Sequence, residues 1–384
     1  MYILLVEKYF RPQKFIGLLV AFFAISFIYS PAKGQKLDPN FTAENVMKTM
    51  HRVADWQIND LKSKSHSYRS PHWLNATFYA GLYALGTIPD EERYLKFLYE
   101  IGEEFQWETG KDRFYADAYC MGQTYVLMYR KFKEPKMIAN FRRQADSVLA
   151  KDHSESLKWE NKIYLREWAW ADALFMAPPG FGYLTAETGD YKYLDGAVSL
   201  YWRTKELLYS PKDKLFFRDD RFIDKKEANG KPVFWSRGVG WVLAGIVRFM
   251  ESMPADYVHR KKFEDLYKAM AKKVASIQQP DGSWHASLLD PDSYPVKEMS
   301  GTGFHCYALM WGVNNKMLSE KKYMPVIQKA WRSMISSVNE EGKLGYVQPP
   351  GDAADKVTSE TTGKYGVGAF LLAGTEIHRY LNNR

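Results

Sequence analysis

Hydrophobic segments of two kinds alternate along this chain of 384 residues. Six segments are nearly uncharged and rich in Gly, Ala and aromatic residues: 73–85, 115–129, 168–177, 235–250, 300–313 and 365–377. Charged, amphipathic segments alternate with them, at about 42–62, 91–106, 135–151, 191–208, 257–279 and 319–339. A helix that is apolar around its whole circumference is buried on every side, whereas an amphipathic helix covers a core with one face. The pattern therefore predicts six inner helices, each preceded by an outer helix.

The spacing within the amphipathic segments indicates helices. In the fifth of them, apolar side chains recur at steps of three and four residues: Phe263, Leu266, Tyr267, Met270, Val274 and Ile277. Strand signals are short and confined to pieces such as residues 214–217 and 345–347. We therefore expect an all-α protein.

Six helical hairpins can bury their apolar helices by closing into a ring. The fold predicted for residues 40–384 is therefore an (α/α)6 barrel, with the apolar helices inside. An open α-solenoid is the alternative, but its two faces would not separate buried from exposed helices so strongly. In a closed ring, the loops that enter the inner helices all open at one end of the barrel. We expect the chemistry at that end.

Residues 1–34 differ from the rest of the chain. Lys8, Arg11 and Lys14 precede an apolar run over residues 15–29, which leads to a cluster of small residues ending at Gly34. This order predicts a secretory signal peptide over residues 1–34. A membrane anchor is the alternative, but the apolar run is short for a bilayer span. We expect an exported protein, periplasmic or secreted, without membrane contact once the signal is cleaved.

Composition narrows the class of partner. The formal net charge of +8 suits an acidic partner, such as nucleic acid, acidic lipid or a uronic-acid polysaccharide. The basic residues are scattered, however, and no run of Lys and Arg resembles a nucleic-acid patch. Aromatic residues make up 16% of the chain, more than a core needs, and sugars stack on flat rings. Cys120 and Cys306 are the only cysteines, lack metal-ligand spacing and are expected to be buried thiols.

The loops that lead into the predicted inner helices carry basic side chains. These loops supply Arg69, His72, Arg113, Arg166, Lys231 and Lys364. The predicted mouth of the barrel is therefore basic and aromatic, which suits an acidic sugar.

Ionisable residues are rare in the apolar segments, so each needs an explanation. Asp117 begins the second segment and Asp172 lies early in the third, and neighbouring helices of a ring would bring both carboxylates into one pocket. Burial beside Trp168, Trp170 and Phe175 raises the pKa of a carboxyl, while a nearby cation lowers it. A raised pKa makes a proton donor near neutral pH, as general acid catalysis requires. The structural alternatives for Asp172 are a helix cap and an ion pair.

Three other polar residues have two interpretations each. Arg237 begins the fourth segment, between Trp235 and Trp241, and could bind a substrate carboxylate or form a structural ion pair. His305 and His72 are either pocket-lining groups or satisfied polar residues. Neither histidine has a second ligand at metal spacing, so no metal site is predicted.

Two spacings make the chain recognisable: Trp170-x-Asp172-x-x-x-Met176 and Trp235-x-Arg237-x-x-x-Trp241. Together with WADALFMAPP, FWSRGVGWVLAG, SGTGFHCYALMWGVNN and KLGYVQP, they make it resemble glycoside hydrolase family 105, the unsaturated rhamnogalacturonyl hydrolases, related to the family 88 unsaturated glucuronyl hydrolases. The likeness runs from about residue 45 to the C-terminus. It implies the (α/α)6 barrel and a substrate left by polysaccharide lyases, whose non-reducing end is a 4,5-unsaturated uronic acid.

The resemblance also implies a mechanism. In the family, an aspartic acid protonates C4 of the C4=C5 vinyl ether, water adds at C5, and the unstable hemiketal opens and expels the rest of the chain. Asp172 matches that acid, and Asp117 matches a second aspartate that contacts sugar hydroxyls and tunes the first. Binding positions around the unsaturated ring are matched by Arg237, Trp235, Trp241, Trp170 and Met176. The chemistry requires no metal or organic cofactor.

One stretch departs from the family's pattern. Members often carry a histidine before the WSRG-type motif, where this chain has Phe216-Phe217-Arg218-Asp219-Asp220. The further candidates for substrate binding are Arg218, His72, His305 and Tyr365. The next sugar, the galacturonic or glucuronic origin of the unsaturated ring and the residue that binds its carboxylate stay open. The expected partner is an unsaturated uronic-acid oligosaccharide and not nucleic acid, and we expect a monomer.

Other functions could use the same residues. A conventional inverting glycosidase would use Asp172 as acid and Asp117 as base, with carboxyls about 6.5–9.5 Å apart. A polysaccharide lyase would take a proton with Tyr365 or His305 and hold the carboxylate with Arg237, which leaves Asp172 idle. A non-catalytic glycan-binding protein would tolerate the loss of Asp172.

Overall fold

The computed structural model describes residues 41–112, 115–161 and 167–383. The predicted signal peptide, Arg113 and Arg166 lie outside these residues. Of the helices in the described ranges, none is both long and apolar enough to cross a membrane.

The helices lie where the two hydrophobic patterns predict them. The outer helices are α1 (Ala43–Lys62), α3 (Glu92–Glu104), α5 (Lys136–Leu149), α8 (Tyr191–Leu208), α10 (Arg260–Ser276) and α12 (Glu320–Ile335). The inner helices are α2 (Trp73–Gly86), α4 (Met121–Phe132), α7 (Pro178–Thr188), α9 (Ser236–Met250), α11 (Met299–Asn314) and α13 (Lys364–Asn382). All residues of α9 are buried, whereas α10 buries one face, as their compositions require.

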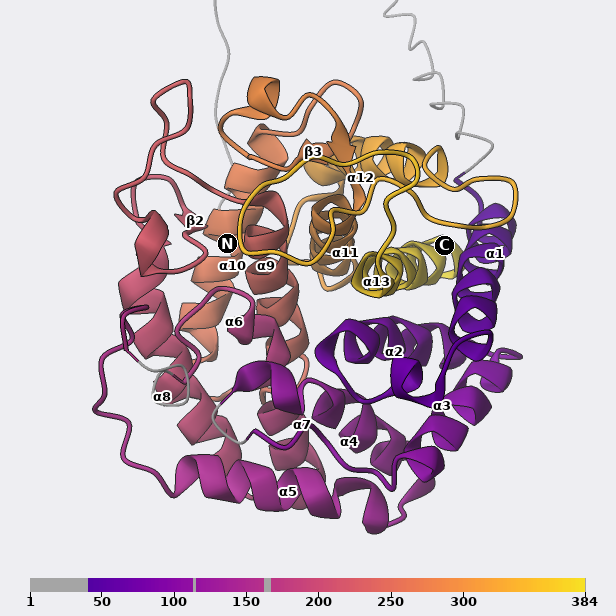
Figure 1. The fold of residues 1–384 in the computed structure, drawn as a ribbon, viewed down its shortest axis with the longest axis vertical. Coiled ribbons are helices and arrows are strands. Elements are labelled where there is room, and N and C mark those ends of the chain that lie inside the picture. The colour runs from indigo at the N-terminus through magenta and orange to yellow at the C-terminus, as the bar shows by residue number, and fades with distance from the viewer. Residues whose placement is uncertain (1–40, 113–114, 162–166, 384) are drawn as a thin grey trace, which may run out of the picture. The chain divides into compact units, whose positions relative to one another are not determined.

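The inner helices form a closed ring, which Figure 1 shows surrounded by the outer helices. In sequence order, α2, α4, α7, α9, α11 and α13 each pack against the next, and α13 packs back against α2. That closing contact brings two backbones together, because a Cβ on Gly81 would lie 2.4 Å from the carbonyl oxygen of Gly368. The closure confirms the predicted (α/α)6 barrel over the open solenoid.

The third inner segment is broken into two pieces. The predicted helix over residues 168–177 is reduced to α6 (Ala173–Met176), and α7 begins at Pro178. Pro178 and Pro179 cannot donate backbone hydrogen bonds to the preceding turn, so α6 ends before them. The inner helix of this hairpin is therefore α7, and α6 is a separate turn packed on α9.

Short elements connect the helices. The 3-10 turns are η1 (His66–Arg69), η2 (Ala116–Tyr119), η4 (Asp220–Phe222) and η5 (Pro291–Ser293). Strand β1 (Tyr209–Ser210) pairs antiparallel with β2 (Leu215–Phe216), and β3 (Trp284–His285) pairs antiparallel with β4 (Lys297–Glu298). The strand signal at residues 345–347 is wrong, because this segment bonds to neighbouring loops: the amides of Tyr346 and Val347 donate to the carbonyls of Thr358 and Thr361.

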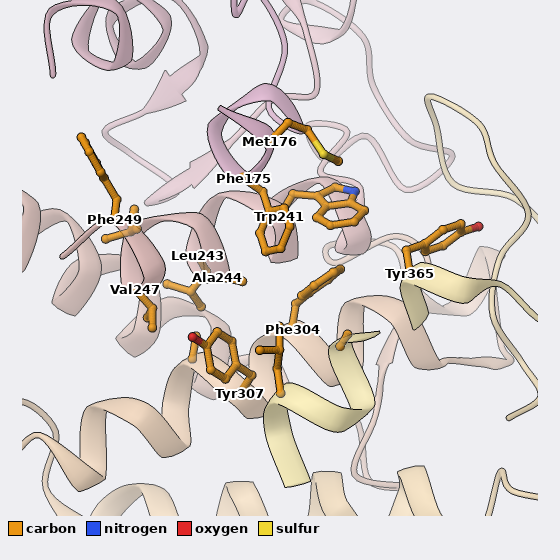
Figure 2. Close-up of a cluster of buried hydrophobic side chains, with 14 of the residues drawn as sticks. Phe175, Met176, Trp241, Leu243, Ala244, Val247, Phe249, Phe304, Tyr307 and Tyr365 are labelled. Atoms are coloured by element: carbon orange, nitrogen blue, oxygen red, sulfur yellow. The ribbon is translucent and has the colours of Figure 1, made fainter. Parts of the chain in front are cut away.

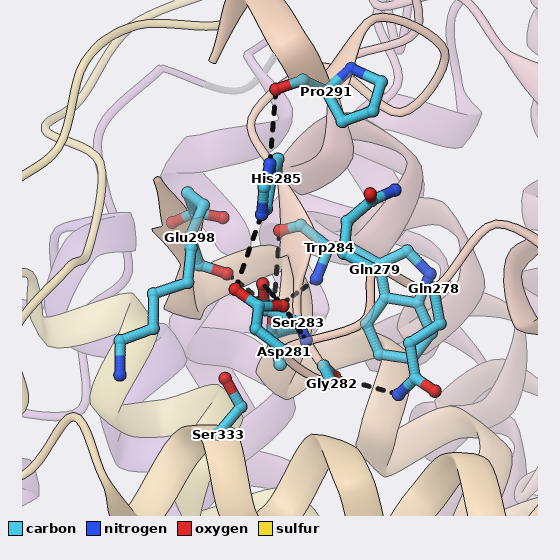
Figure 3. Close-up of polar contacts among 12 residues, drawn as sticks. Gln278, Gln279, Asp281, Gly282, Ser283, Trp284, His285, Pro291, Glu298 and Ser333 are labelled. Atoms are coloured by element: carbon cyan, nitrogen blue, oxygen red, sulfur yellow. Dashed lines mark hydrogen bonds and ion pairs between the residues drawn. The ribbon is translucent and has the colours of Figure 1, made fainter. Parts of the chain in front are cut away.

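The loop between α10 and α11 is ordered by carboxylates (Figure 3). Asp281 accepts hydrogen bonds from the amide and hydroxyl of Ser283, at 2.9 and 2.7 Å, and lies 3.5 Å from His285. Glu298 caps α11 by accepting from the amides of Ser300 and Gly301, at 2.9 and 2.7 Å. The same carboxylate accepts from the amide of Gln348 at 3.1 Å and so ties α11 to the loop before α13.

Gly245 allows α6 to lie directly on α9. A Cβ at this position would lie 2.2 Å from the carbonyl oxygen of Leu174 and 2.9 Å from the Cα of Phe175. Because both neighbours are backbone atoms, we expect Gly245→Ala to lower the free energy of unfolding by about 1–3 kcal/mol. Chemical denaturation measures this change. Gly351→Ala is the control, because a Cβ there meets nothing closer than 3.9 Å; equal stability of the two variants would contradict the prediction.

Candidate active site

The predicted site residues gather at the ends where the inner helices begin. Asp117 lies in η2 just before α4, and Asp172 immediately precedes α6. Arg237 and Tyr365 are the second residues of α9 and α13. Because the inner helices run in the same direction around the ring, these starts share one end of the barrel. We call this end the mouth.

Asp172 occupies the N-cap position of α6, and not the interior of a longer helix as the sequence predicts. Its side chain makes no capping hydrogen bond. Capping residues usually have extended backbone angles, whereas Asp172 already has helical ones, φ −61° and ψ −33°. The carboxylate is therefore free for another role, although it stands where a cap would stand.

The surroundings of Asp172 favour its protonated form. The residue is 8% exposed, and its buried Oδ2 has no hydrogen-bond partner among the described residues. Burial raises the pKa of Asp172, and the charges of Arg218 and Arg237 oppose that rise. The Nε of Arg218 lies 3.6 Å from Oδ2, at ion-pair distance but beyond a normal hydrogen bond. Asp172 is thus a buried acid beside a cation.

Asp117 forms a coupled pair with Asp172. Burial and then the charge of Asp172 raise the pKa of Asp117 to about 7, while a hydrogen bond from Tyr115 acts in the opposite direction. The Oδ1 of Asp117 is buried without a hydrogen-bond partner in the described chain. Two carboxyls that feel each other's charge lose their protons in two steps that belong to the pair. The pair therefore retains one proton up to about neutral pH.

Arg218 is held by the stretch that departs from the family's pattern. Its Nη1 donates to Asp219 at 2.7 Å, and the fully buried Asp219 also accepts from Arg221 at 2.8 and 2.9 Å. Arg221 reaches Asp352 at 2.6 Å and lies 3.6 Å from the ring centre of Trp159. The amide of Ala171 donates to the carbonyl of Arg218 at 2.7 Å. This network fixes a partly exposed cation beside Asp172.

Arg237 is committed to the loop that crosses the mouth. Its guanidinium donates to the carbonyls of Gln348 and Pro349, at 2.6 and 3.0 Å, and lies between the rings of Trp235 and Tyr365. The Nε1 of Trp235 donates to the side chain of Gln348 at 3.0 Å. No carboxylate of the described residues pairs with Arg237, which is 1% exposed. In this structure Arg237 positions the loop and adds positive charge near Asp172.

The predicted aromatic positions form a buried wall beneath the mouth (Figure 2). The ring of Trp241 lies 4.8 Å from that of Phe175 and 4.3 Å from that of Phe304, and Met176 lies beside it. Trp170 is also buried, with Tyr115 at 5.1 Å. These side chains lie beneath the surface of the mouth, and Tyr115, Arg218 and Trp73 are partly exposed.

The two predicted histidines are placed differently. His305 has no exposed surface and packs against Trp284 at 5.1 Å, and burial lowers its pKa to about 3. It belongs to the packing between α9 and α11, so the structure does not bring it to the substrate surface. His72 is exposed at the mouth, where it caps α2 by accepting from the amide of Leu74 at 3.4 Å.

Gln123 supplies hydrogen bonds at the point where the double proline interrupts the helix. Pro179 has no N–H for the carbonyl of Phe175, which a continuous helix would provide. The Nε2 of Gln123 instead donates to the carbonyls of Phe175 and Met176, at 2.7 and 3.1 Å. Its Oε1 accepts from the Nε of Arg248 at 2.9 Å. Gln123 thus joins α4, α6 and α9, the elements that place Asp117, Asp172 and Arg237.

Replacing Gln123 by leucine removes these bonds from a buried site. A buried polar group that loses its partner costs roughly 1–3 kcal/mol, so we expect a loss of about 3 kcal/mol in the free energy of unfolding. Thermal and chemical denaturation measure this loss. Gln328→Leu on α12, where the glutamine is partly exposed, is the matched control; if both variants are equally stable, Gln123 does not hold α6.

Metal ligands do not gather at the mouth in the described chain. One group with ligand atoms within 4.8 Å of one another consists of His153, Glu155 and Glu167. Its charges are matched within the protein, since His153 contacts Glu167 and Lys151 lies 3.2 Å from Glu155. None of the predicted site residues belongs to this group. The predicted core thiols, Cys120 and Cys306, are buried and unpaired.

Sequence reasoning missed several residues that the fold brings to the site. Gln348 stands in the quoted motif KLGYVQP, which was its only signal, and Asp219 and Arg221 stand beside the noted departure. Gln123 and Tyr115 lie in an apolar segment, where a lone amide or hydroxyl is a weak signal. Gln348 bonds to Trp235, 113 positions away, and Gln123 bonds to Phe175, 52 positions away, so these roles needed the tertiary structure.

Comparisons with known proteins show the family of the chain. The family model described as Glycosyl Hydrolase Family 88 matches residues 48–381. A curated relative from Alteromonas sp. (strain LOR), named unsaturated 3S-rhamnoglycuronyl hydrolase, is 34% identical over 90% of this chain and 89% of its own. A solved family 88 glycosyl hydrolase from Bacteroides vulgatus is 28% identical, with a TM-score of 0.81, covering 88% of this chain and all of that one.

One similar structure carries a different description. A solved protein described as a polysaccharide lyase is 29% identical, with a TM-score of 0.80, and covers 89% of this chain and 99% of that one. Two solved proteins with this barrel and a similar identity to this chain are therefore described differently, one as a hydrolase and one as a lyase. The two activities differ in what happens to the C4=C5 double bond.

Proposed function

The chain belongs to glycosyl hydrolase family 88, and from this premise we propose that it removes a 4,5-unsaturated uronic acid from the non-reducing end of lyase-generated oligosaccharides. The observation that carries the proposal is the coupled pair of Asp172 and Asp117, a buried proton donor at the mouth. A cation, Arg218, lies beside it. Hydration of an enol ether begins with protonation of carbon, which requires such a donor.

In the proposed reaction, Asp172 gives its proton to C4 of the vinyl ether. Positive charge develops at C5 and O5, and the carboxylate that Asp172 has become stabilises it. Water adds at C5, and its proton returns to Asp172. The C5 hemiketal opens, and the hemiacetal left at C1 releases the rest of the chain. The enzyme ends each cycle protonated, as it began.

We place the substrate carboxylate at Arg218. The Nη donors of Arg237 are turned to the carbonyls of Gln348 and Pro349 and its Nε is buried, whereas Arg218 keeps 13% of its side chain exposed beside Asp172. The curated relatives are unsaturated 3S-rhamnoglycuronyl hydrolases. Their names support a rhamnose-linked unsaturated glycuronyl group as the substrate of this chain.

One assay tests the reaction. The protein is incubated with lyase-generated oligosaccharides, and the ultraviolet absorbance of the conjugated enoate is followed. Hydration of the double bond predicts a loss of absorbance. An ordinary inverting glycosidase or a glycan-binding protein leaves the absorbance unchanged, and either result would overturn the proposal.

A polysaccharide lyase is the second candidate, favoured by the solved structure that is described as one. A lyase creates the enoate, so incubation with an intact uronic-acid polysaccharide would raise the absorbance. It would also leave Asp172 without a role. We expect no rise with intact polysaccharide and a fall with the unsaturated oligosaccharides.

The pH dependence follows from the carboxyl pair. The reaction needs the proton that the pair retains, and the pKa of Asp117 is raised to about 7. As the pH rises through this range the pair loses its last proton, so kcat/KM should be constant below about pH 6 and fall tenfold per unit well above pH 7. Initial rates across pH measure the profile. Activity that keeps rising above pH 8 would exclude a carboxyl donor.

We also propose export and a monomeric state. The order of charged, apolar and small residues over 1–34 supports export, and fractionation of the native host tests it. The proposed reaction uses residues that one barrel brings together, so it needs no second subunit. Sedimentation analysis of the mature protein tests this, and a dimer would contradict it.

A further inference from the structure

A cavity of about 620 Å3 lies at the end of the barrel opposite the mouth. It is bordered by the final turns of the inner helices and the loops after them; Tyr83, Arg130, Arg248 and Asn315 are examples. Arg248 follows Arg237 on α9 by eleven residues, which places it about 16 Å further along the barrel. We call this cavity the base pocket. It is separate from the site of Asp172.

Arg248 is a buried cation without an ion-pair partner. It is 3% exposed and lines the base pocket. Its Nε donates to Gln123, but its Nη2 has no hydrogen-bond partner among the described residues, and none of their carboxylates lies within ion-pair distance. An uncompensated buried charge is strongly unfavourable. The charge of Glu251 acts on Arg248 from beyond ion-pair distance, and the small exposed part of Arg248 faces the base pocket.

The other arginines of the base pocket are already neutralised. Arg130 pairs with Glu187 at 2.6 Å, and Arg260 with Glu264 at 3.1 Å. Arg379 pairs with Glu376 at 2.5 Å. Arg248 is therefore the lining arginine without an ion pair in the described chain, and Glu251 is a lining carboxylate without one, so a ligand that carries both a carboxylate and hydroxyl donors would complement the two.

The remaining lining suits a polyhydroxylated ring. Glu251 accepts hydrogen bonds from the hydroxyls of Tyr183 and Tyr307, at 3.0 and 3.5 Å, and its carboxylate is exposed. Trp311 and Asn315 add an aromatic edge and an amide. A carboxylate and an amide bind sugar hydroxyls, and aromatic side chains pack against sugar rings. The volume lies within the range of small-molecule sites.

We propose that the base pocket binds a carboxylated monosaccharide, with the carboxylate on the exposed edge of Arg248, the hydroxyls on Glu251 and Asn315, and the ring beside the edges of Tyr307 and Trp311. The site does not depend on the proposed reaction, because it contains none of the residues at the mouth. Gln123 connects the two ends, since it accepts from Arg248 and donates to the turn that carries Asp172.

Calorimetric titration of the whole protein tests the proposal with four probes: D-glucuronate, D-galacturonate, D-glucose and sodium sulfate. We expect both uronates to bind and glucose not to bind. Arg248→Met should weaken uronate binding roughly tenfold or more, as the loss of a charge-assisted hydrogen bond does. Ala255→Trp should weaken it too, because Ala255 is exposed at the rim of the pocket and a larger side chain fills the entrance.

Ala255→Trp keeps the test decisive if Arg248→Met does not fold, since it leaves the buried network intact. Trp73→Ala at the mouth is the matched control and should retain uronate binding. Three results would overturn the proposal: uronate binding that survives Ala255→Trp but is lost in Trp73→Ala, equal binding of glucose and glucuronate, or no uronate binding at all. If sulfate bound and neither uronate did, the proposed sugar ligand would be wrong and the pocket would be an inorganic oxyanion site.

Discussion

Replacing Asp172 by asparagine is expected to lower kcat/KM for an unsaturated uronyl oligosaccharide by roughly 10²–10⁴-fold, the contribution of a positioned general acid. The amide has the same shape but no acidic proton, and the carboxyl it replaces makes no capping bond that the fold needs. The loss of enoate absorbance under initial-rate conditions measures the effect.

The Asp172→Asn substitution should lower the activity without lowering the stability. A buried carboxyl is replaced by a neutral group of equal size, so the unfolding temperature should be unchanged or higher. Asp265→Asn, an exposed carboxylate on α10 that pairs with Lys261, is the matched control and should retain full activity. A fully active Asp172→Asn protein would refute the assignment of the acid.

Asp117→Asn is expected to have the second largest effect, and its size should depend on pH. In the native pair, burial and the charge of Asp172 raise the pKa of Asp117 to about 7, so the pair loses its last proton near that pH. In the variant, Asp172 is the only carboxyl of the pair that remains, and its pKa is raised by burial against the charges of Arg218 and Arg237, so we expect the proton to be lost at a lower pH. We therefore expect a loss of kcat/KM of roughly tenfold or more near pH 7.5, where the variant has lost the proton that the native pair still partly holds.

Part of this loss should be recovered at acid pH. Because the alkaline limb of the profile moves to lower pH, the ratio of native to variant activity should shrink between pH 7.5 and pH 5.5. A purely structural defect would lower the activity by the same factor at every pH. If the alkaline limb of the pH profile stayed at the same pH while the activity fell, Asp117 would bind the sugar and would not affect the proton of Asp172.

Much of the fold could be predicted because the signals are local. The apolar spacing of Phe263, Tyr267 and Met270 predicts α10 without knowledge of its neighbours, and the apolar composition of residues 235–250 predicts that α9 is buried. The prediction of closure also rested on these patterns, since inner helices without a polar face have no other way to avoid water.

The candidate site was predictable only in part. Asp117, Asp172 and Arg237 stand out because ionisable residues are rare in apolar helices, and all three lie at the mouth. His305 has the same signal but packs away from the mouth, because burial of a neutral imidazole against Trp284 is also stable. The rarity of a polar residue in an apolar segment shows that its position has a cause. It does not show whether that cause is packing or function.

The sequence by itself determined the twelve-helix pattern, the buried character of the inner ring and the end of α6 at the double proline. Only the tertiary structure decided that Arg218 lies beside Asp172, that Arg237 holds Gln348 and Pro349, and that Arg248 is left unpaired at the other end. The physical reason is the distance along the chain over which each interaction acts. Hydrophobic periodicity and proline act within a few residues, whereas the charge and hydrogen bonds of a site join side chains that are distant along the chain and become neighbours only when the ring closes.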